Sequence, residues 1–195
     1  MLINLLKKYK VYLVSESPRR HQLLSDMGVD FEFMPVRVEE NYSENLKPVE
    51  VAEYLSQLKL STIEMELFPD ETIFIACDTI VVIEDEVIGK PKDEQDALQM
   101  LRKLSGKEHL VISGLTIATP QKKLTSHKQT LVKFKDFSDE ELQYYVARYK
   151  PLDKAGAYGV QEWLGYVGID YIHGSFYNVM GLPTKLLWDM LTEIV

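Results

Sequence analysis

Cysteine is nearly absent from this sequence of 195 residues, which contains only Cys77. No intrachain disulfide can form, and no cysteine pair or cysteine–histidine cluster is available for a structural zinc site. Long apolar runs are absent as well: none approaches the roughly 18 residues of a membrane helix, and the apolar stretch at residues 2–6 is too short for a secretory signal. We therefore expect a soluble protein of the reducing cytoplasm that does not enter membranes.

Positively charged residues are also fewer than negatively charged ones. Lys and Arg number 22 against 30 Asp and Glu, which gives a formal net charge of −8. This balance argues against binding to nucleic-acid polymers or anionic membranes, although it leaves room for a small basic pocket. Four common motifs of nucleotide binding and hydrolysis, GxxxxGK[ST], GxGxxG, GxSxG and HExxH, are missing.

What is present is an ordinary globular composition, 46% hydrophobic and 27% charged. Periodicity and helix-end signals predict alternating strands and helices, and this alternation indicates an α/β protein. The expected strands are 11–14, 31–34, 72–83, 87–88, 110–119 and 124–134, and the expected helices are 18–27, 48–62, 93–105, 138–149 and a last one from about 183. The glycine-rich segment 152–182 is expected to be irregular.

The start of the first long predicted helix suggests an anion site. Ser17 and Pro18 are typical of the N-cap and first helical positions, and Arg19 and Arg20 follow. Cations in a first turn oppose the helix dipole unless an anion is bound there. Amides, dipole and two guanidinium groups would together bind phosphate. The alternative, equally favoured by these residues alone, is two arginines that lie in solvent or pair with nearby glutamates.

Asp78 interrupts the most apolar predicted strand. A carboxylate there is costly to bury without a partner, so a metal ion, a cation or a catalytic role would explain it; a salt bridge at an exposed strand end is the alternative. If the following hairpin is centred on Asp85, Lys90 faces Ile80 and shares a sheet face with Asp78. A register change of one residue would remove that relation.

Other candidate residues are ambiguous by themselves. Glu40 reads as part of a solvated acidic loop, and Lys59 and Lys90 read as surface lysines. The glycine-dense segments 155–161 and 174–183 indicate tight turns or a close approach to a ligand, with a long structural loop as the alternative.

Taken together, these pieces resemble the Maf-like family. The resemblance spans about residues 11–192, and six motifs occur in the family's order. They are 15–20 (SESPRR), 39–40 (EE), 76–81 (ACDTIV), 89–91 (GKP), 152–161 (LDKAGAYGVQ) and 178–183 (NVMGLP).

The resemblance implies a nucleoside triphosphate pyrophosphatase, in which water cleaves the α–β phosphoanhydride with the help of Mg²⁺ or Mn²⁺. It implies a single domain over residues 1–195, built on a mixed, twisted central sheet flanked by helices, with two lobes around a deep cleft. Such proteins are often homodimers.

Site roles follow from the resemblance, residue by residue. Asp78 matches the proton acceptor, and Glu40 and Asp78 match the acidic pair near metal and water. Ser17, Arg19 and Arg20 match the phosphate-binding loop, and Lys59 and Lys90 match the lysines that neutralise the triphosphate.

The branch of the family acting on dTTP and UTP is matched by Arg19, Thr79 and Gln161. Two further hypotheses stay open: a pyrophosphatase that prefers modified nucleotides, such as 5-methyl or pseudouridine triphosphates, and a nucleotide-binding regulator linked to cell division. The aromatic segment 162–173 could shape either the base pocket or a dimer surface.

Overall fold

The structure is a computed structural model that describes all residues, 1–195. Its helices are α1 (Leu2–Leu6), α2 (Pro18–Asp26), α3 (Pro48–Leu60), α4 (Glu94–Leu104), α5 (Asp139–Tyr149), α6 (Trp163–Gly168), α7 (Phe176–Met180) and α8 (Thr184–Ile194), with 3₁₀ turns η1 (Met65–Leu67) and η2 (Ala155–Ala157). Its strands are β1 (Lys10–Leu13), β2 (Glu32–Phe33), β3 (Thr72–Ile83), β4 (Glu86–Ile88), β5 (Glu108–Ala118), β6 (Lys123–Phe134) and β7 (Ile169–His173).

The strands form one mixed sheet in the order β2-β1-β3-β5-β6-β7, and β4 pairs with β3. β1 is parallel to β2 and β3, whereas the β3–β4 and β6–β7 pairs are antiparallel. A mixed sheet flanked by helices confirms the predicted α/β class. None of the helices has the length and apolar character needed to cross a bilayer.

The chain divides into two compact units. Unit 1 comprises Met1–Asp78, Ser113–Lys128 and Gly181–Val195, and unit 2 comprises Thr79–Ile112 and Gln129–Met180. Each of the three long strands β3, β5 and β6 contributes residues to both units. The boundary within β3 falls between Asp78 and Thr79, two of the residues expected in the site.

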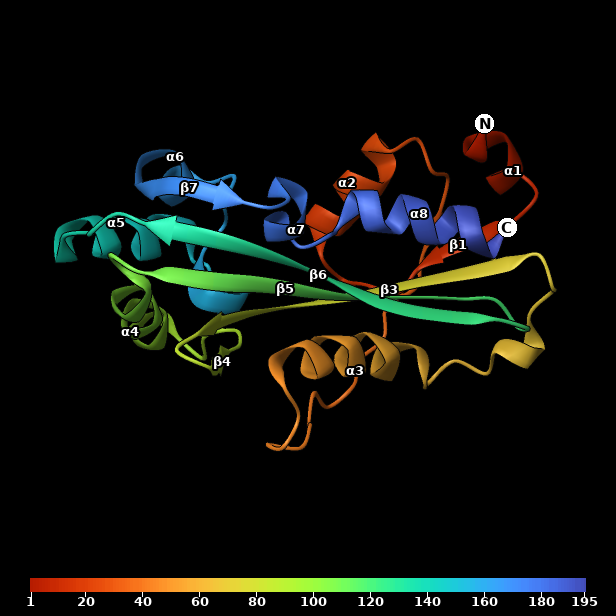
Figure 1. Cartoon of the computed structure of the whole chain (residues 1–195), viewed down its shortest axis with the longest axis horizontal. Coiled ribbons are helices and arrows are strands. Elements are labelled where there is room, and N and C mark those ends of the chain that lie inside the picture. The colour runs from red at the N-terminus through yellow and green to blue at the C-terminus, as the bar shows by residue number, and fades with distance from the viewer. The chain divides into compact units, whose positions relative to one another are not determined.

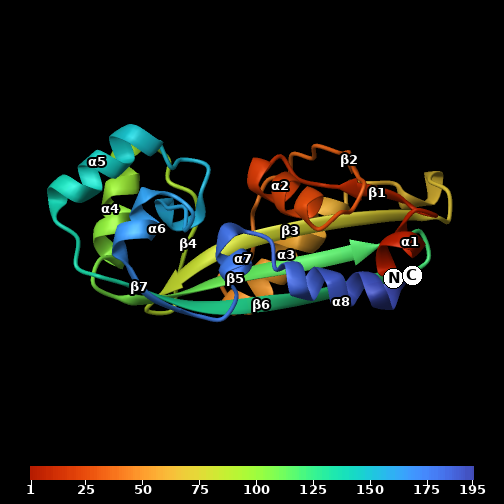
Figure 2. The ribbon, with the colours of Figure 1, turned by 90° about the horizontal axis from the view of Figure 1, so that it is seen from above.

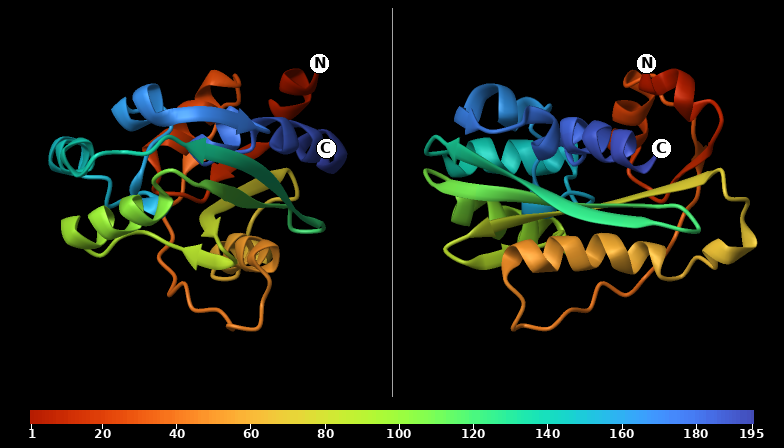
Figure 3. Two further views of the ribbon diagram at one scale, coloured as in Figure 1. Left: turned by 60° about the vertical axis from the view of Figure 1, so that its left-hand side comes forward. Right: turned by 45° about the vertical axis from the view of Figure 1, so that its right-hand side comes forward.

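Unit 1 packs helices on both faces of its strands. Figures 1 and 3 show α3 on one face and α2 and α8 on the other. Its core includes Tyr12, whose ring stacks on Phe74, together with Leu60 from the end of α3. α1 lies beside the end of α8, so the two termini meet (Figures 1 and 2).

In unit 2, α4, α5 and α6 are grouped together (Figure 2). α4 contacts both α5 and η2. The core contains the buried His109. Its ring packs edge-on against Tyr158 and at a tilt against Phe134. Its Nε2 lies 2.7 Å from Tyr158 Oη. Burial lowers the pKa of His109 to about 4, so the imidazole is neutral at physiological pH.

Most predicted elements are present within a few residues of the expected ends. The segment 152–182 is the exception: the expectation of an irregular segment is wrong, because it contains η2, α6, β7 and α7. These elements have only three to six residues each. The helical elements among them span less than two turns each, which is too short for a clear helical pattern. The prediction of an irregular segment therefore followed from the density of glycine.

The predicted hairpin register is also wrong by one residue. The observed pairs are Val81–Ile88, Val82–Val87 and Ile83–Glu86. Glu84 and Asp85 both have positive φ, 51° and 64°, as a two-residue type I′ turn requires. β4 ends before Lys90, so this lysine does not pair with Ile80, and the register gives no support for a face shared with Asp78.

At Gly114 of β5, helix α3 comes close to the sheet. A Cβ at Gly114 would lie 2.0 Å from the carbonyl oxygen of Ala52. We predict that Gly114→Ala lowers the free energy of unfolding by about 1–3 kcal/mol, since the helix must move away from β5. Urea denaturation measures this. The matched control is Gly89→Ala, where nothing lies within 4 Å of the new Cβ; equal losses in the two variants would contradict the steric account.

His109 should make stability pH-dependent. Its folded-state pKa of about 4 lies below its ordinary value of 6.5, so between these values the unfolded state binds a proton that the folded state does not. Stability from this residue is complete above pH 6.5 and falls by about 3 kcal/mol as the pH drops to 4. We predict that His109→Phe flattens the profile of unfolding free energy in this window. His173→Gln, at an exposed position of β7, should leave it as in the wild type.

Candidate active site

The centre of the charged site in unit 1 is Asp78 on β3. Residues 72–78 of this strand are all buried, and Asp78 itself is 5% exposed. Its carboxylate accepts a short hydrogen bond from Nζ of Lys59. Oε1 of Glu40 lies 3.4 Å from the same Nζ. Three of the expected site residues thus form one contact cluster, and Asp78 has the cationic partner that its burial requires.

Helix α3 brings Lys59 to this cluster. Pro48 occupies the first helical position, and Val51 and Leu55 form a buried stripe along the helix. Lys59 comes four residues after Leu55 and therefore continues that stripe toward the sheet. Its side chain is 12% exposed. The prediction of a surface lysine is therefore wrong for Lys59. The side chain of Glu40 is 39% exposed, but its carboxylate contacts the ammonium of Lys59.

The carboxylates of Glu40 and Asp78 fit a hard divalent cation. The chain has no cluster of three or more histidine, cysteine and acidic side chains that could enclose a metal by themselves. Mg²⁺, however, is usually held by one or two carboxylates together with waters and substrate phosphates. Both carboxylates converge on one cationic atom, Lys59 Nζ, so they already face a common point of positive charge.

The loop before α2 is organised by Ser15, a residue to which the sequence assigned no role. Its buried hydroxyl accepts hydrogen bonds from the backbone N–H of Ser17 (3.2 Å) and from Nη1 of Arg20 (3.3 Å). Its carbonyl oxygen lies 2.7 Å from Nε2 of His21. The only sequence signal for Ser15 was its membership of the first motif.

Ser17 and the two arginines lie where they were expected. Ser17 is the N-cap of α2, although its side chain makes no capping hydrogen bond. Arg19 and Arg20, both half-buried, follow in the first turn. Nε of Arg20 donates to the carbonyl oxygen of Gly181 at 2.7 Å. Arg20 therefore also stabilises the fold, because this hydrogen bond connects the start of α2 to the residues just before α8.

The three remaining residues that the sequence predicts for the site belong to unit 2. Thr79 is half-buried on β3, and Lys90 is exposed in the loop after β4. Gln161 is half-buried, and its Oε1 is buried without a hydrogen-bond partner. An orphaned buried acceptor is uncommon in proteins and suits a site that receives a donor from a ligand. The Lys90 loop is linked to the Gln161 segment, since the N–H of Gly156 donates to the carbonyl of Gly89 at 3.0 Å.

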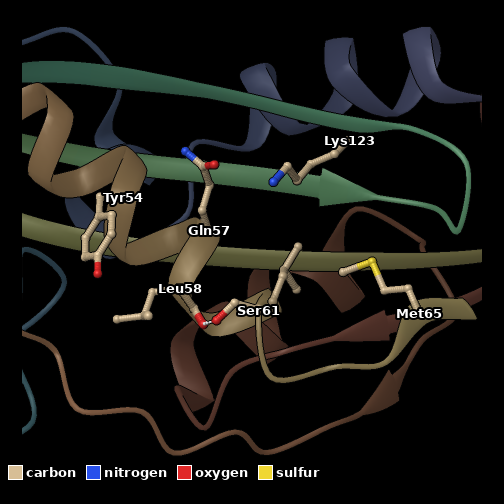
Figure 4. A pocket seen from close by; sticks show the side chains of 7 residues that line it. Tyr54, Gln57, Leu58, Ser61, Met65 and Lys123 are labelled. Atoms are coloured by element: carbon tan, nitrogen blue, oxygen red, sulfur yellow. Dashed lines mark hydrogen bonds between the residues drawn. The ribbon is translucent and has the colours of Figure 1, made fainter.

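A separate pocket of about 340 Å³ lies in unit 1 at the end of α3. It is lined mainly by apolar surface, and the side chain of Lys123 extends from the start of β6 toward Gln57 (Figure 4). The remaining lining residues are Tyr54, Leu58, Leu60, Ser61 and Met65. None of the expected site residues lines this pocket, so it is distinct from the cluster around Lys59.

The family model described as Maf-like protein matches residues 10–194. The chain belongs to the Maf-like family. Among its relatives, a protein of Flavobacterium johnsoniae named dTTP/UTP pyrophosphatase is 45% identical over the whole of both chains. A protein of the same name from Phocaeicola vulgatus is 46% identical, again over the full length of both.

One solved structure, a HAM1 protein from Coxiella burnetii, aligns with 65% of this Maf-like chain and 73% of its own, at 12% identity and a TM-score of 0.41. This likeness is too weak to bear on function.

The ion pair of Lys59 and Asp78 should be energetically coupled. Removing one partner of a buried pair leaves the other charge uncompensated, so we predict that Lys59→Met lowers the free energy of unfolding by about 3 kcal/mol. Combined with Asp78→Asn, the loss should be smaller than the sum of the single losses by at least about 1 kcal/mol. Urea denaturation of the four proteins measures this.

The exposed pair Lys185–Asp189 on α8 is the matched control. The same cycle there should give a coupling of no more than about 0.5 kcal/mol, because water screens exposed ion pairs. Additive losses at Lys59 and Asp78 would contradict the contact.

Proposed function

We propose that this protein hydrolyses dTTP and UTP to the nucleoside monophosphate and pyrophosphate, and so removes these nucleotides from the cytoplasmic pool. The full-length relatives of the Maf-like chain carry the name of this activity. The observation that carries the proposal at the level of chemistry is the cluster of Asp78, Lys59 and Glu40. A nucleotide binder has no need of two carboxylates beside a polyanion, whereas a hydrolase needs a base for water.

Asp78 is the proton acceptor in this proposal. Water attacks at the α–β phosphoanhydride, its proton passes to the Asp78 carboxylate, and pyrophosphate leaves. The ammonium of Lys59 holds the carboxylate in one orientation before substrate binds. Because Asp78 lies in the middle of a buried strand, its position does not depend on a mobile loop. Such preorganisation lowers the barrier by avoiding rearrangement during the reaction.

The positive groups offset the charge of the triphosphate. Arg19 and Arg20 would bind phosphate oxygens at the start of α2, where backbone N–H groups and the helix dipole also favour an anion. Lys59 and Lys90 would meet the negative charge that develops on the leaving pyrophosphate. Ser17 offers its hydroxyl at the same helix start.

Glu40 and Asp78 would hold the divalent metal, Mg²⁺ or Mn²⁺, together with the substrate phosphates. When bound, the metal would polarise phosphate oxygens and lower the pKa of a coordinated water. With a metal bound, the two carboxylates would depend less on Lys59, and its ammonium could contact the phosphate chain.

Selectivity for the base is assigned to Arg19, Thr79 and Gln161. The buried Oε1 of Gln161 can accept the N3–H of uracil or thymine, a donor that cytosine lacks. Acceptance of a 5-methyl group would follow from the same contact, because N3–H is common to both bases. We also propose a homodimer as the assembled form.

The test of the proposed activity is pyrophosphate release from a panel of nucleoside triphosphates, with and without Mg²⁺ or Mn²⁺. We expect metal-dependent release from dTTP and UTP. Asp78→Asn should lower kcat by about 10²–10⁴-fold, the usual contribution of a general base, with a smaller change in KM.

Asp85→Asn is the matched control, since it makes the same change at the exposed hairpin turn, where positive φ suits asparagine. It should leave kcat unchanged. Binding of nucleotides with no turnover of any of them would favour a regulator, and faster turnover of a modified uridine triphosphate would favour the second enzyme hypothesis. Full activity of Asp78→Asn would contradict its role as proton acceptor.

A further inference from the structure

Gln161 is presented by a tight turn whose two ends are held by one hydroxyl group. The N–H of Glu162 donates to the carbonyl of Gly159 at 3.0 Å, so Val160 and Gln161 are the two central residues of the turn. The N–H of Gly159 donates to Oη of Tyr145 at 2.9 Å. The same Tyr145 hydroxyl donates a short hydrogen bond to the carboxylate of Glu162. One side chain of α5 therefore closes the turn.

The charge of Glu162 is balanced by Lys154, whose Nζ lies 3.1 Å from Oε1 of Glu162 and 2.7 Å from Oδ1 of Asp153. The side chains of Lys154 and Glu162 are only 9% and 18% exposed. Gly159 allows this packing, because a Cβ there would lie 2.7 Å from Cδ of Glu162. A charged pair this buried holds a defined geometry, since neither partner is well solvated without the other.

Tyr145 itself has little freedom. It is fully buried on α5, and its ring stacks on Tyr149 with centroids 5.1 Å apart. Burial and the neighbouring Glu162 carboxylate raise the pKa of Tyr145, so the hydroxyl remains a donor at any assay pH. α5 begins with a complete capping box at Ser138 and Glu141. The Tyr145 hydroxyl is thus carried by a helix with a well-defined start.

We propose that Tyr145, Glu162 and Lys154 are positioning residues that set base selectivity by fixing the turn that carries Gln161. This inference rests on the proposed function, in which Gln161 accepts the N3–H of the base. A fixed turn keeps the Gln161 acceptor where UTP can supply a donor and CTP cannot. A loosened turn lets Gln161 move away, so the advantage of UTP over CTP falls while phosphate binding and hydrolysis persist.

The decisive experiment compares kcat/KM for UTP and CTP in the wild type, Tyr145→Phe and Gln161→Ala. Tyr145→Phe removes only the hydroxyl. We expect the UTP-to-CTP ratio to fall by about tenfold, the size expected for loss of one discriminating hydrogen bond, and kcat for CTP to stay within about twofold. Gln161→Ala should lower the ratio at least as far.

Tyr149→Phe is the matched control, because it makes the same change on the next turn of α5 and leaves both hydrogen bonds of the Tyr145 hydroxyl in place. Its ratio should equal that of the wild type.

Near-UV circular dichroism and thermal unfolding show whether each variant is folded. If Tyr145→Phe does not fold, Glu162→Gln replaces it. This variant keeps an acceptor for the Tyr145 hydroxyl but removes one of the two carboxylates that contact Lys154, and its ratio should also fall.

A charge rescue separates positioning from general damage. Lys154→Met leaves Glu162 without its cation and should lower the ratio. Adding Glu162→Gln to Lys154→Met removes the unpaired charge and should return the ratio to within about threefold of the wild type, because contacting residues are not additive.

The outcomes distinguish this inference from the proposed function. No turnover of any nucleotide by the wild type would contradict the proposed function itself. A wild type that prefers UTP, with an unchanged ratio in folded Tyr145→Phe or Glu162→Gln, would overturn only the positioning role. An equal loss of kcat/KM for UTP and CTP would overturn it as well, because that result indicates damage without a change in selectivity.

Discussion

A single ammonium group, Nζ of Lys59, holds two carboxylates in place in this protein, and the arrangement of unit 1 around it follows from that contact. Asp78 lies in a strand whose neighbours are buried, where an unpaired carboxylate would be strongly destabilising. Its partner comes from α3, so this helix must lie close against the sheet. Gly114 makes the approach possible, because any side chain there would meet the backbone of Ala52. The loop that carries Glu40 contacts the same ammonium.

The same cluster explains how a stable fold can keep charged groups ready for chemistry. In the free protein, both carboxylates contact the ammonium of Lys59. In the proposed reaction, a polyphosphate with its metal would bring both negative and positive charge to this cluster, so the lysine and the carboxylates could each exchange one partner for another. Within unit 1, contacts of Ser15 and of Arg20 with the carbonyl of Gly181 fix the loop before α2. In unit 2, Gln161 lies on a turn that is supported by hydrogen bonds from Tyr145 of α5.

Much of the fold follows from local patterns in the sequence. The apolar run from Thr72 to Ile83, interrupted only by Asp78 and Thr79, predicted a strand buried on both faces with the observed bounds. The capping residues Asp93 and Ser138 marked two helix starts correctly. The hairpin register was not predictable from these patterns, because Glu84 and Asp85 adopt positive φ without a glycine to signal it.

The site was harder to predict than the fold, since its contacts join residues far apart in the sequence. Local spacing placed Lys59 on a helix, but its partner Asp78 is supplied by β3. The contact of Tyr145 has the same origin, because its hydroxyl accepts from the N–H of Gly159, fourteen residues later in the chain. Ser15 differs, since its contacts with Ser17 and Arg20 are local. The six Maf-like motifs include Ser15 and Asp78 but neither Lys59 nor Tyr145, and they did not reveal which side chains are in contact.

The most direct test of the central claim is ³¹P NMR of the products when the wild type turns over UTP in the presence of Mg²⁺. If the cluster of Asp78, Lys59 and Glu40 promotes hydrolysis of the α–β phosphoanhydride, the spectrum will show UMP and pyrophosphate in equal amounts, and Asp78→Asn will produce neither at a comparable rate. Formation of UDP and orthophosphate would contradict the account, because a different bond would then be the one that this site breaks.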